Sequence, residues 1–405
     1  MTPLPGQSAG TNTGPGKLPF PTREETILPD NVTSGFTTSL ETAGKTFEFH
    51  YRGPDGHLVY RYRPASGTLS DVTACWEGRG TPFQPLADGG IRLAVGDGGR
   101  AAAPEKFEPV ECRRAEDAVI STWHCRHGGQ TADVTYTLRL WQKSLVVDVR
   151  CLGGQVAEFS IGKAVGLAQP RLVTLPYLTS DEQRPAVLVA GPAEQPLFTM
   201  ALLDYYRSNA STLFALNQVA DDGVTCNGGS RYLPRTDGRR NDCFERLFLT
   251  ISPRLEEVLP NIPNPRSPWM HVAGQRLWRA HGASNRQSDY DLWKKVARYG
   301  MTEVVITDHE TGWRDGGESF TFRTRAAPGK GGDEGQAEYA RKIRSLGFRY
   351  GIYNNYTDYA PVNEYWQEDR VTRYPRRCLA AIDPAAGKNG FASVSPATAR
   401  VGGGP

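Results

Sequence analysis

The feature that most constrains this chain is a long run of short, turn-bounded segments of β type between residues 46 and 252. Residues 46–51 alternate apolar and polar side chains, as a strand with one wet face does, and residues 58–62 follow after the turn 53–56. The same pattern predicts further strands at residues 68–76, 91–95, 118–124, 133–141, 145–152, 156–161, 186–190, 198–203 and 244–251. So many short strands over about 200 residues favour a large antiparallel β-sandwich.

The pattern changes after a proline-rich boundary. Prolines at 253, 260, 263, 265 and 268 cannot lie in a continuous helix or a central strand. We therefore expect an α+β multidomain protein, a large antiparallel β-sandwich followed by an incomplete (β/α) barrel segment. The expected parts are a disordered lead-in at 1–30, a β-sandwich domain at 31–255, a Pro-rich linker at 256–270, a partial (β/α)8-barrel at 271–375 and an irregular tail at 376–405.

Two repeats of one pattern support the barrel-like part. A capping-box sequence begins at Ser288, an apolar stripe at helical spacing follows, and Gly300 ends the predicted helix before a β-branched strand at 303–307. The pattern recurs with Asp333 and Gln336 as cap residues, Gly347 as the stop and a strand at 350–353. Helix, glycine and strand in this order, twice, indicate βα units with a parallel sheet.

Composition excludes several classes of function. With 39% hydrophobic and 22% charged residues, the chain is typical of a globular protein, and its net charge of +3 gives no field to attract nucleic acid. No apolar run is long enough to span a membrane, so neither nucleic acid nor a membrane is an expected partner. No signal peptide or transmembrane segment is visible, so the compartment stays open; a start placed too late would hide a signal, and the protein would then be extracellular or periplasmic. The oligomeric state stays open as well.

Cysteine usage argues against cofactors and metals. The seven cysteines contain no C-x-x-C pair, and small buried thiols are the simplest interpretation. Asp308, His309 and Glu310 are neighbours on an extended segment and point to opposite faces, so they cannot all reach one ion. We expect no metal and no cofactor.

Polar and aromatic side chains follow both strands of the barrel-like part. Functional groups of such barrels lie at the carboxyl ends of the strands, and carboxylates and amides there bond sugar hydroxyls while aromatic faces pack on pyranose C–H groups. The candidate substrate-binding residues are Asp308, His309, Glu310, Trp313, Asn354, Asn355, Tyr356 and Asp358. The alternative is that polar residues end these strands simply because loops are wet.

The segment Val304-Val305-Ile306-Thr307-Asp308-His309-Glu310, placed after a sandwich and a Pro-rich linker, resembles retaining glycoside hydrolases of the α-galactosidase-like clan and the related endo-α-N-acetylgalactosaminidases. Residues 271–373 carry most of the resemblance. It implies a nucleophile and an acid/base carboxylate about 5–5.5 Å apart, on barrel strands well past the second. At most one further strand, at 379–383, fits before the tail, so the resemblance implies a truncated barrel without its catalytic strands, and no catalytic residue is assigned.

Three functional hypotheses follow. The first is a fragment of a glycoside hydrolase that recognises sugar, with the catalytic carboxylate strands missing. The alternative is a non-catalytic carbohydrate-binding β-sandwich protein. A third is a complete protein of another kind, whose C-terminal part forms a small α/β domain that docks a partner. Whether the chain is an enzyme stays open.

Overall fold

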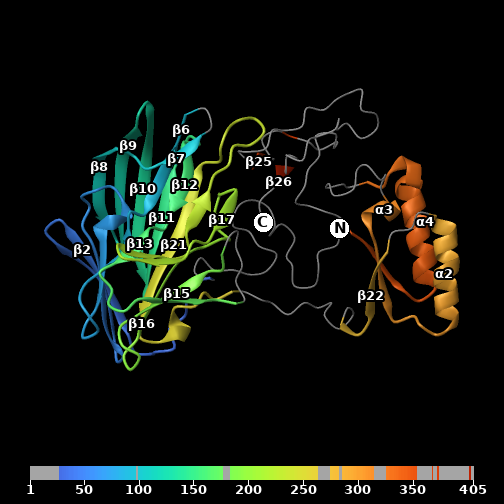
Figure 1. The fold of residues 1–405 in the computed structure, drawn as a ribbon, viewed down its shortest axis with the longest axis horizontal. Helices are drawn as coiled ribbons and strands as arrows, with labels where there is room; N and C mark the ends of the chain where they lie inside the picture. Colours follow the sequence, from blue (N-terminus) through green and yellow to red (C-terminus); the bar gives the residue numbers. More distant parts are fainter. Residues whose placement is uncertain are drawn as a thin grey trace. The chain divides into compact units, whose positions relative to one another are not determined.

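The computed structural model describes residues 27–96, 99–176, 183–262, 274–281, 285–313, 325–353, 367, 372–373 and 401–402. The chain divides into two compact units, drawn in Figure 1: Met1–Leu233 with Arg239–Asn264, and Pro234–Gly238 with Pro265–Pro405. Among the described residues, no helix is long and apolar enough to cross a membrane.

The first unit is built of antiparallel sheets, as the sequence predicts. The largest has eight strands in the order β14 (Arg171–Thr174), β15 (Ala186–Ala190), β16 (Leu197–Leu203), β21 (Cys243–Ser252), β11 (Ser144–Cys151), β10 (Gln130–Trp141), β9 (Ala118–His127) and β8 (Lys106–Ala115). A four-stranded meander contains β1 (Thr37–Ala43), β2 (Thr46–Gly53), β3 (Gly56–Tyr62) and β4 (Val72–Trp76).

Two smaller sheets complete this unit. One has five strands in the order β17 (Thr212–Phe214), β20 (Gly229–Arg231), β12 (Val156–Ser160), β6 (Gly90–Val95) and β7 (Arg100–Ala102). The other has four, in the order β18 (Gln218–Ala220), β19 (Gly223–Thr225), β13 (Lys163–Val165) and β5 (Gln84–Ala87). A 3-10 helix, η1 (Leu69–Asp71), takes the start of the strand predicted at 68–76, because the Thr68 side chain caps it by accepting from the Ser70 N–H.

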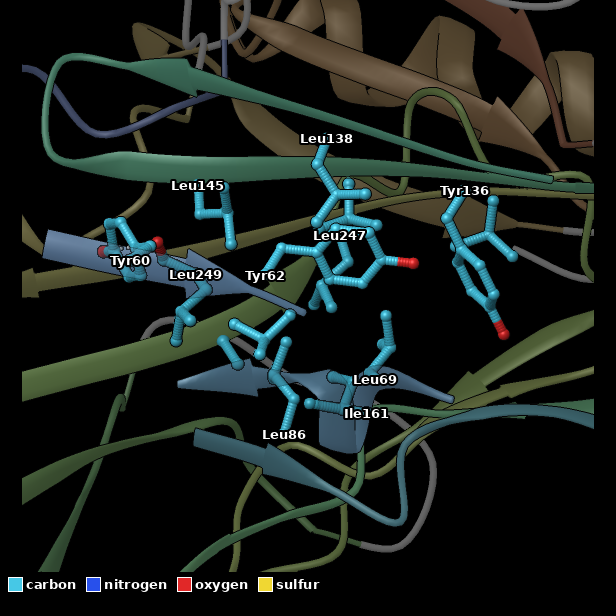
Figure 2. Packing of buried hydrophobic residues seen from close by; sticks show 14 of the residues in the cluster. Tyr60, Tyr62, Leu69, Leu86, Tyr136, Leu138, Leu145, Ile161, Leu247 and Leu249 are labelled. Atoms are coloured by element: carbon cyan, nitrogen blue, oxygen red, sulfur yellow. Dashed lines mark hydrogen bonds between the residues drawn. The ribbon is translucent and has the colours of Figure 1, made fainter. Parts of the chain in front are cut away.

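The main core lies between the eight-stranded sheet and the sheets facing it. Figure 2 shows Tyr62, Leu69 and Leu86 approaching leucines of β10, β11 and β21. Tyr60 is fully buried there, and its hydroxyl donates to the carbonyl oxygens of Lys143 at 2.7 Å and Leu249 at 3.0 Å. Such bonds satisfy the polar end of an otherwise apolar ring.

The central strands of the large sheet are buried on both faces. Leu247 and Leu249 of β21 join the main core, whereas Phe248 between them packs with Val146 in a second cluster on the opposite face. Two-sided burial explains why residues 247–249 of β21 and 145–147 of β11 are unbroken apolar runs instead of alternating sequences.

The second cluster also contains residues from both ends of this unit. Ile27 and Leu28 are 1% and 0% exposed, so this part of the predicted disordered lead-in packs in the core. At the other end, η2 (Leu255–Glu257) precedes Val258, which is fully buried in the same cluster. The start of the Pro-rich segment therefore belongs to the packed sandwich, because its apolar residues bury against β16 and β21.

The six cysteines that the structure describes are free thiols, four of them buried. Burial raises the pKa of Cys125 to about 11 and that of Cys226 to about 12, so both are unreactive in the folded protein. Cys378 lies outside the described residues.

The second unit contains a three-stranded parallel sheet with helices. Its strands are β22 (Leu277–His281), β23 (Val304–Asp308) and β24 (Arg349–Ile352), in this order. Its helical elements are α2 (Arg286–Arg298), α3 (Glu310–Trp313), η4 (Pro328–Lys330) and α4 (Gly332–Ser345). A two-residue pairing joins β25 (Thr372–Arg373) to β26 (Val401–Gly402), and the strand predicted at 379–383 lies outside the described residues.

The two helices that pack on the parallel sheet, α2 and α4, have N-cap residues other than the predicted ones. Asn285, not Ser288, caps α2, because its side chain accepts from the Gln287 and Ser288 N–H groups. The cap of α4 is Gly331 in the left-handed region, and Asp333 instead accepts from the Ala326 N–H at 2.8 Å. The end of α2 follows the prediction, since Gly300 has φ +75° and the Met301 N–H reaches back to the Val296 carbonyl.

Candidate functional site

The candidate site begins at the last residue of β23. Val304, Ile306 and Asp308 alternate with less buried neighbours along this strand. Val304 and Ile306 pack with Trp293 of α2 and Ile343 of α4 in one apolar cluster. Because alternate residues share a face, the Asp308 side chain also lies on the helix side of the sheet, and the residue is 1% exposed.

A chain of hydrogen bonds holds the Asp308 carboxylate. The Tyr350 hydroxyl donates to Asp308 Oδ2 at 2.5 Å and accepts from Gln336 Nε2 at 2.7 Å. Gln336 Oε1 in turn accepts from the Arg286 guanidinium, which also donates to the Lys330 carbonyl. The network thus links β23, β24, α4 and α2, and its polar groups support one another within the packed layer.

One oxygen of the network has no partner. Asp308 Oδ1 is buried and receives no hydrogen bond from the residues that the structure describes. Burial raises the pKa of Asp308, although the bond from Tyr350 opposes this rise. Burial and the nearby Asp308 charge also raise the pKa of Tyr350, so the phenol stays a donor. Asp308 was expected to face substrate, but its side chain in fact joins the sheet to its helices.

A second group of residues gathers just beyond the carboxyl ends of β23 and β24. The His309 and Tyr353 rings stack with centroids 5.1 Å apart and an interplanar angle of 4°. The Tyr353 N–H donates to the Asp308 carbonyl at 2.9 Å, and Trp313 Nε1 donates to the Tyr353 carbonyl at 3.0 Å. Trp313 is 2% exposed and Tyr353 is 42% exposed, so a buried ring fixes the backbone of a partly exposed tyrosine.

The remaining predicted residues are only partly placed. Glu310 begins α3, directly after the strand end, but its side chain lies outside the described part of the structure. Asn354, Asn355, Tyr356 and Asp358 also lie outside the described residues. The structure therefore brings His309 and Trp313 together around Tyr353 and places Asp308 behind them.

The sheet face away from the helices holds a residue that the sequence analysis missed. Trp278 of β22 is 64% exposed, and its Nε1 donates to Thr307 Oγ1 at 2.7 Å. Trp278 pairs with Val305 in the parallel register, so both lie on the face opposite Asp308. Sequence analysis did not single out Trp278, because it predicted no strand over residues 277–281.

Removing the Tyr350 hydroxyl is expected to loosen the junction of sheet and helices. Tyr350→Phe takes away the hydrogen bond to a buried carboxylate and should lower the local opening free energy of β23 by about 1–3 kcal/mol. Amide hydrogen exchange of β23, read by mass spectrometry, measures this change. Tyr299→Phe is the matched control, since Tyr299 is 84% exposed. Unchanged exchange in Tyr350→Phe would show that the network adds no stability.

The described residues contain no group of three or more histidine, cysteine, aspartate or glutamate side chains suited to hold a metal ion. No family model matches the sequence, and no curated protein matches it.

Comparison with solved structures does find similar folds. The chain is similar to an α-N-acetylgalactosaminidase, NagBb, from Bifidobacterium bifidum, with 10% identity and a TM-score of 0.44 over 83% of this chain and 62% of that one. It is also similar to the GH36 α-galactosidase AgaB from Geobacillus stearothermophilus, with 11% identity and a TM-score of 0.41 over 84% of this chain and 60% of that one. The chain thus spans about three fifths of the length of these structures.

Proposed function

We propose that the second unit recognises carbohydrate at the carboxyl edge of β23 and β24, as part of a glycoside hydrolase of the α-galactosidase-like kind that the sequence resembles. The observation that carries the proposal is the stacked His309–Tyr353 pair, in which Tyr353 is 42% exposed. An aromatic ring presented at such an edge suits the apolar C–H face of a pyranose, and the neighbouring histidine supplies a polar group for a hydroxyl.

The parallel sheet itself supports a barrel interpretation, which we also propose. The strands β22, β23 and β24 adjoin in chain order, and α2 and α4 pack on one face. In a (β/α)8 barrel the other face would line the interior, and Trp278 and Thr307 lie on that face. Substrates of such barrels bind at the carboxyl ends of the strands, where His309 and Tyr353 are found.

The same geometry limits what Asp308 does in this function. Its carboxylate is engaged by Tyr350 on the helix side, so it serves to position the strand end that carries His309. By the resemblance, hydrolysis with retention needs two carboxylates about 5–5.5 Å apart. We assign neither role to a described residue of this edge, and we propose recognition of sugar as the task of these strands.

The alternative is that the sandwich binds the sugar. A cavity of about 180 Å³ in the first unit, lined by Arg79, Phe83 and Leu197 among others, is the observation that would favour it. Ligand pockets usually enclose about 300–1,000 Å³, and the Arg79 guanidinium is already donating to the Pro196 carbonyl. The edge of the parallel sheet is therefore the better-supported location.

A binding experiment on the full chain tests the proposal. Galactose and N-acetylgalactosamine are titrated against wild type and Tyr353→Ala by calorimetry, with Tyr299→Ala as the control for an exposed tyrosine elsewhere in the same unit. Losing the stacked ring should weaken binding by up to about tenfold, as expected for an aromatic contact of about 0.5–1.5 kcal/mol.

The outcomes separate the hypotheses. Sugar binding that Tyr353→Ala leaves intact would move the site to the sandwich, and no binding of either sugar would overturn the proposal. Hydrolysis of an aryl α-galactoside by the purified chain would show that the chain contains a catalytic pair, contrary to the sequence expectation.

A further inference from the structure

The strand β1 forms one edge of the four-stranded sheet in the first unit, away from the site described above. Six of its seven residues are exposed, and Leu40 is partly buried. The strand pairs with β2 over its whole length without a register shift, and it contains no proline. Among the strands that the structure describes, none pairs with its other side. Such an edge presents unpaired backbone N–H and C=O groups to solvent.

The other sheet edges of the first unit are short or interrupted. β5, β7, β14, β17 and β18 have only three or four residues each, and β4 continues into a bridge to Phe83. β8 has ten residues, but it contains Pro109, a register shift beside this proline and several charged residues. Short strands, prolines, bulges and charges prevent edge strands from pairing with other chains. With Glu41 as its one charged residue, β1 is the described edge of this unit best suited to accept another strand.

The turn between β1 and β2 determines which backbone groups of β1 point outward. A two-residue loop that begins with Gly44, at φ +64°, joins Ala43 to Thr46. In a hairpin of this kind, the two residues that flank the loop form a hydrogen-bonded pair. Hydrogen-bonded and non-hydrogen-bonded pairs then alternate along the antiparallel ladder. The residues whose N–H and C=O groups point away from β2 are therefore Thr38, Leu40 and Thr42.

We propose that β1 pairs antiparallel with β1 of a second copy of this chain, about a two-fold axis at Leu40. In this register Leu40 lies opposite the partner's Leu40, and Thr38 lies opposite the partner's Thr42. All three outward-pointing residues then meet outward-pointing residues, and such pairs exchange both N–H···O bonds, about six in total. A register shifted by two residues would lose one of the three pairs. The contact is isologous, as in most homodimers.

The side chains favour the same register. On the outer face of the sheet, Ser39 lies opposite the partner's Glu41, so no like charges face each other. Arg52 Nη1 lies 3.4 Å from Ser39 Oγ and 3.6 Å from Glu41 Oε1 of its own chain. The carboxylate of the partner's Glu41 would therefore lie near a guanidinium group. On the inner face, Leu40 packs against the main core, and the partner's Leu40 would extend this apolar layer.

Sedimentation velocity of the full chain over a range of concentrations tests the proposal. A contact made by one strand edge is small, so the dimer should be weak and reversible. Thr38→Pro removes an outward N–H, and proline is tolerated in an edge strand where its missing N–H would face solvent. Because the two-fold axis doubles the loss, dimerisation should weaken by about tenfold or more. Thr38→Ala is the matched control, since it keeps the N–H and should dimerise like the wild type.

Amide hydrogen exchange at low and high protein concentration gives a second readout. The outward N–H groups of β1 exchange with solvent in the monomer and should be protected as the dimer forms. The interrupted edge strand β8 is the internal control, because its exchange should not change with concentration. Circular dichroism checks that Thr38→Pro is folded, and Thr42→Pro replaces it if it is not.

Three results would overturn the proposal. The first is a wild type that stays monomeric up to millimolar concentration. The second is dimerisation of a folded proline variant with the affinity of the wild type. The third is concentration-dependent protection of β8 in place of β1, which would put the contact between copies on another surface.

Discussion

Replacing Lys143 with methionine is expected to lower the free energy of unfolding of the sandwich unit by about 3–5 kcal/mol. The Lys143 side chain is 1% exposed, and its ammonium group contacts two carboxylates, Asp55 at 2.5 Å and Glu257. Methionine has a similar shape but no charge. The substitution therefore leaves two carboxylates, one of them fully buried, facing each other without their common cation.

The deficit of this variant should depend on pH. Burial pushes the pKa of Glu257 upward, but hydrogen bonds from Lys143 and Ser252 outweigh it and hold the pKa below its usual 4.5. A carboxyl group with a depressed folded pKa stabilises the fold above about pH 4.5 and loses this contribution as the pH falls through the folded value. Without Lys143, the effect of burial dominates, and the Glu257 carboxyl takes up a proton more readily. The difference in unfolding free energy between Lys143→Met and the wild type should therefore be smaller in acid than at neutral pH.

Urea-induced unfolding followed by far-UV circular dichroism measures the effect. Lys106→Met is the control, because the Lys106 side chain is 62% exposed in its ion pair with Glu108 and such pairs contribute at most about 1 kcal/mol. A loss in Lys143→Met no larger than in Lys106→Met would show that the buried triad is dispensable. The double variant Lys143→Met with Glu257→Gln should recover part of the loss, since it removes the stranded charge.

Glu245→Gln is expected to be more stable than the wild type at about pH 8 and equal to it at about pH 5. Glu245 is fully buried, and its Oε1 accepts from Tyr232 at 2.6 Å, Ser230 at 2.7 Å and Ser208 at 3.1 Å. Oε2 has no hydrogen-bond partner within the described part of the chain. Burial raises the pKa of this carboxyl to about 7 against the opposing effect of these hydrogen bonds.

The sign of the pH dependence follows from this raised pKa. The folded protein holds the proton more tightly than the unfolded chain, so the contribution to stability is complete below the ordinary pKa of 4.5 and is lost as the pH rises through about 7. At about 1.4 kcal/mol per pKa unit, the wild type should lose about 2–3 kcal/mol between pH 5 and pH 8. Glutamine does not titrate, and its amide resembles the protonated acid in shape, so this loss should disappear.

Unfolding free energies of both proteins across this pH range check the prediction. Glu111→Gln is the control, because the Glu111 side chain is 49% exposed in its pair with Arg113. If wild type and Glu245→Gln show the same slope with pH, the Glu245 carboxyl does not carry the proton in the folded state.

Local patterns in the sequence predicted much of the fold, and the failures have physical causes. The hairpin of β2 and β3 follows from alternation and a turn containing Asp55 and Gly56, both of which act within a few residues. The edge strand β8 was missed because it is largely exposed, contains Pro109 and has a register shift beside it, so it shows no alternation. Caps were misplaced because Asn285 and Ser288 are equally good cap residues in sequence.

The position of the candidate site was predictable from the sequence, but the hydrogen-bond partners of Asp308 were not. That polar residues end β23 was visible in the sequence, and the facing of Asp308 toward the helices follows from Ile306 and Val304, two and four residues before it. The partners Tyr350, Gln336 and Arg286 lie on separate elements, so no local pattern could bring them together. The contacts of Lys143 with Asp55 and Glu257 in the sandwich could not be predicted from the sequence for the same reason.

The strand order of the large sheet has a consequence for the chain as it is being synthesised. In the sheet, β21 lies between β11 and β16. One edge of β11 therefore stays unpaired until roughly 90 further residues, from 152 to 242, have been synthesised. At about 5–20 residues per second, this leaves an apolar strand edge unpaired for about 5–20 s on the ribosome. An unpaired edge is a template for pairing with another chain, so the nascent sandwich is expected to need a chaperone during this interval and to aggregate when translation stalls between β16 and β21.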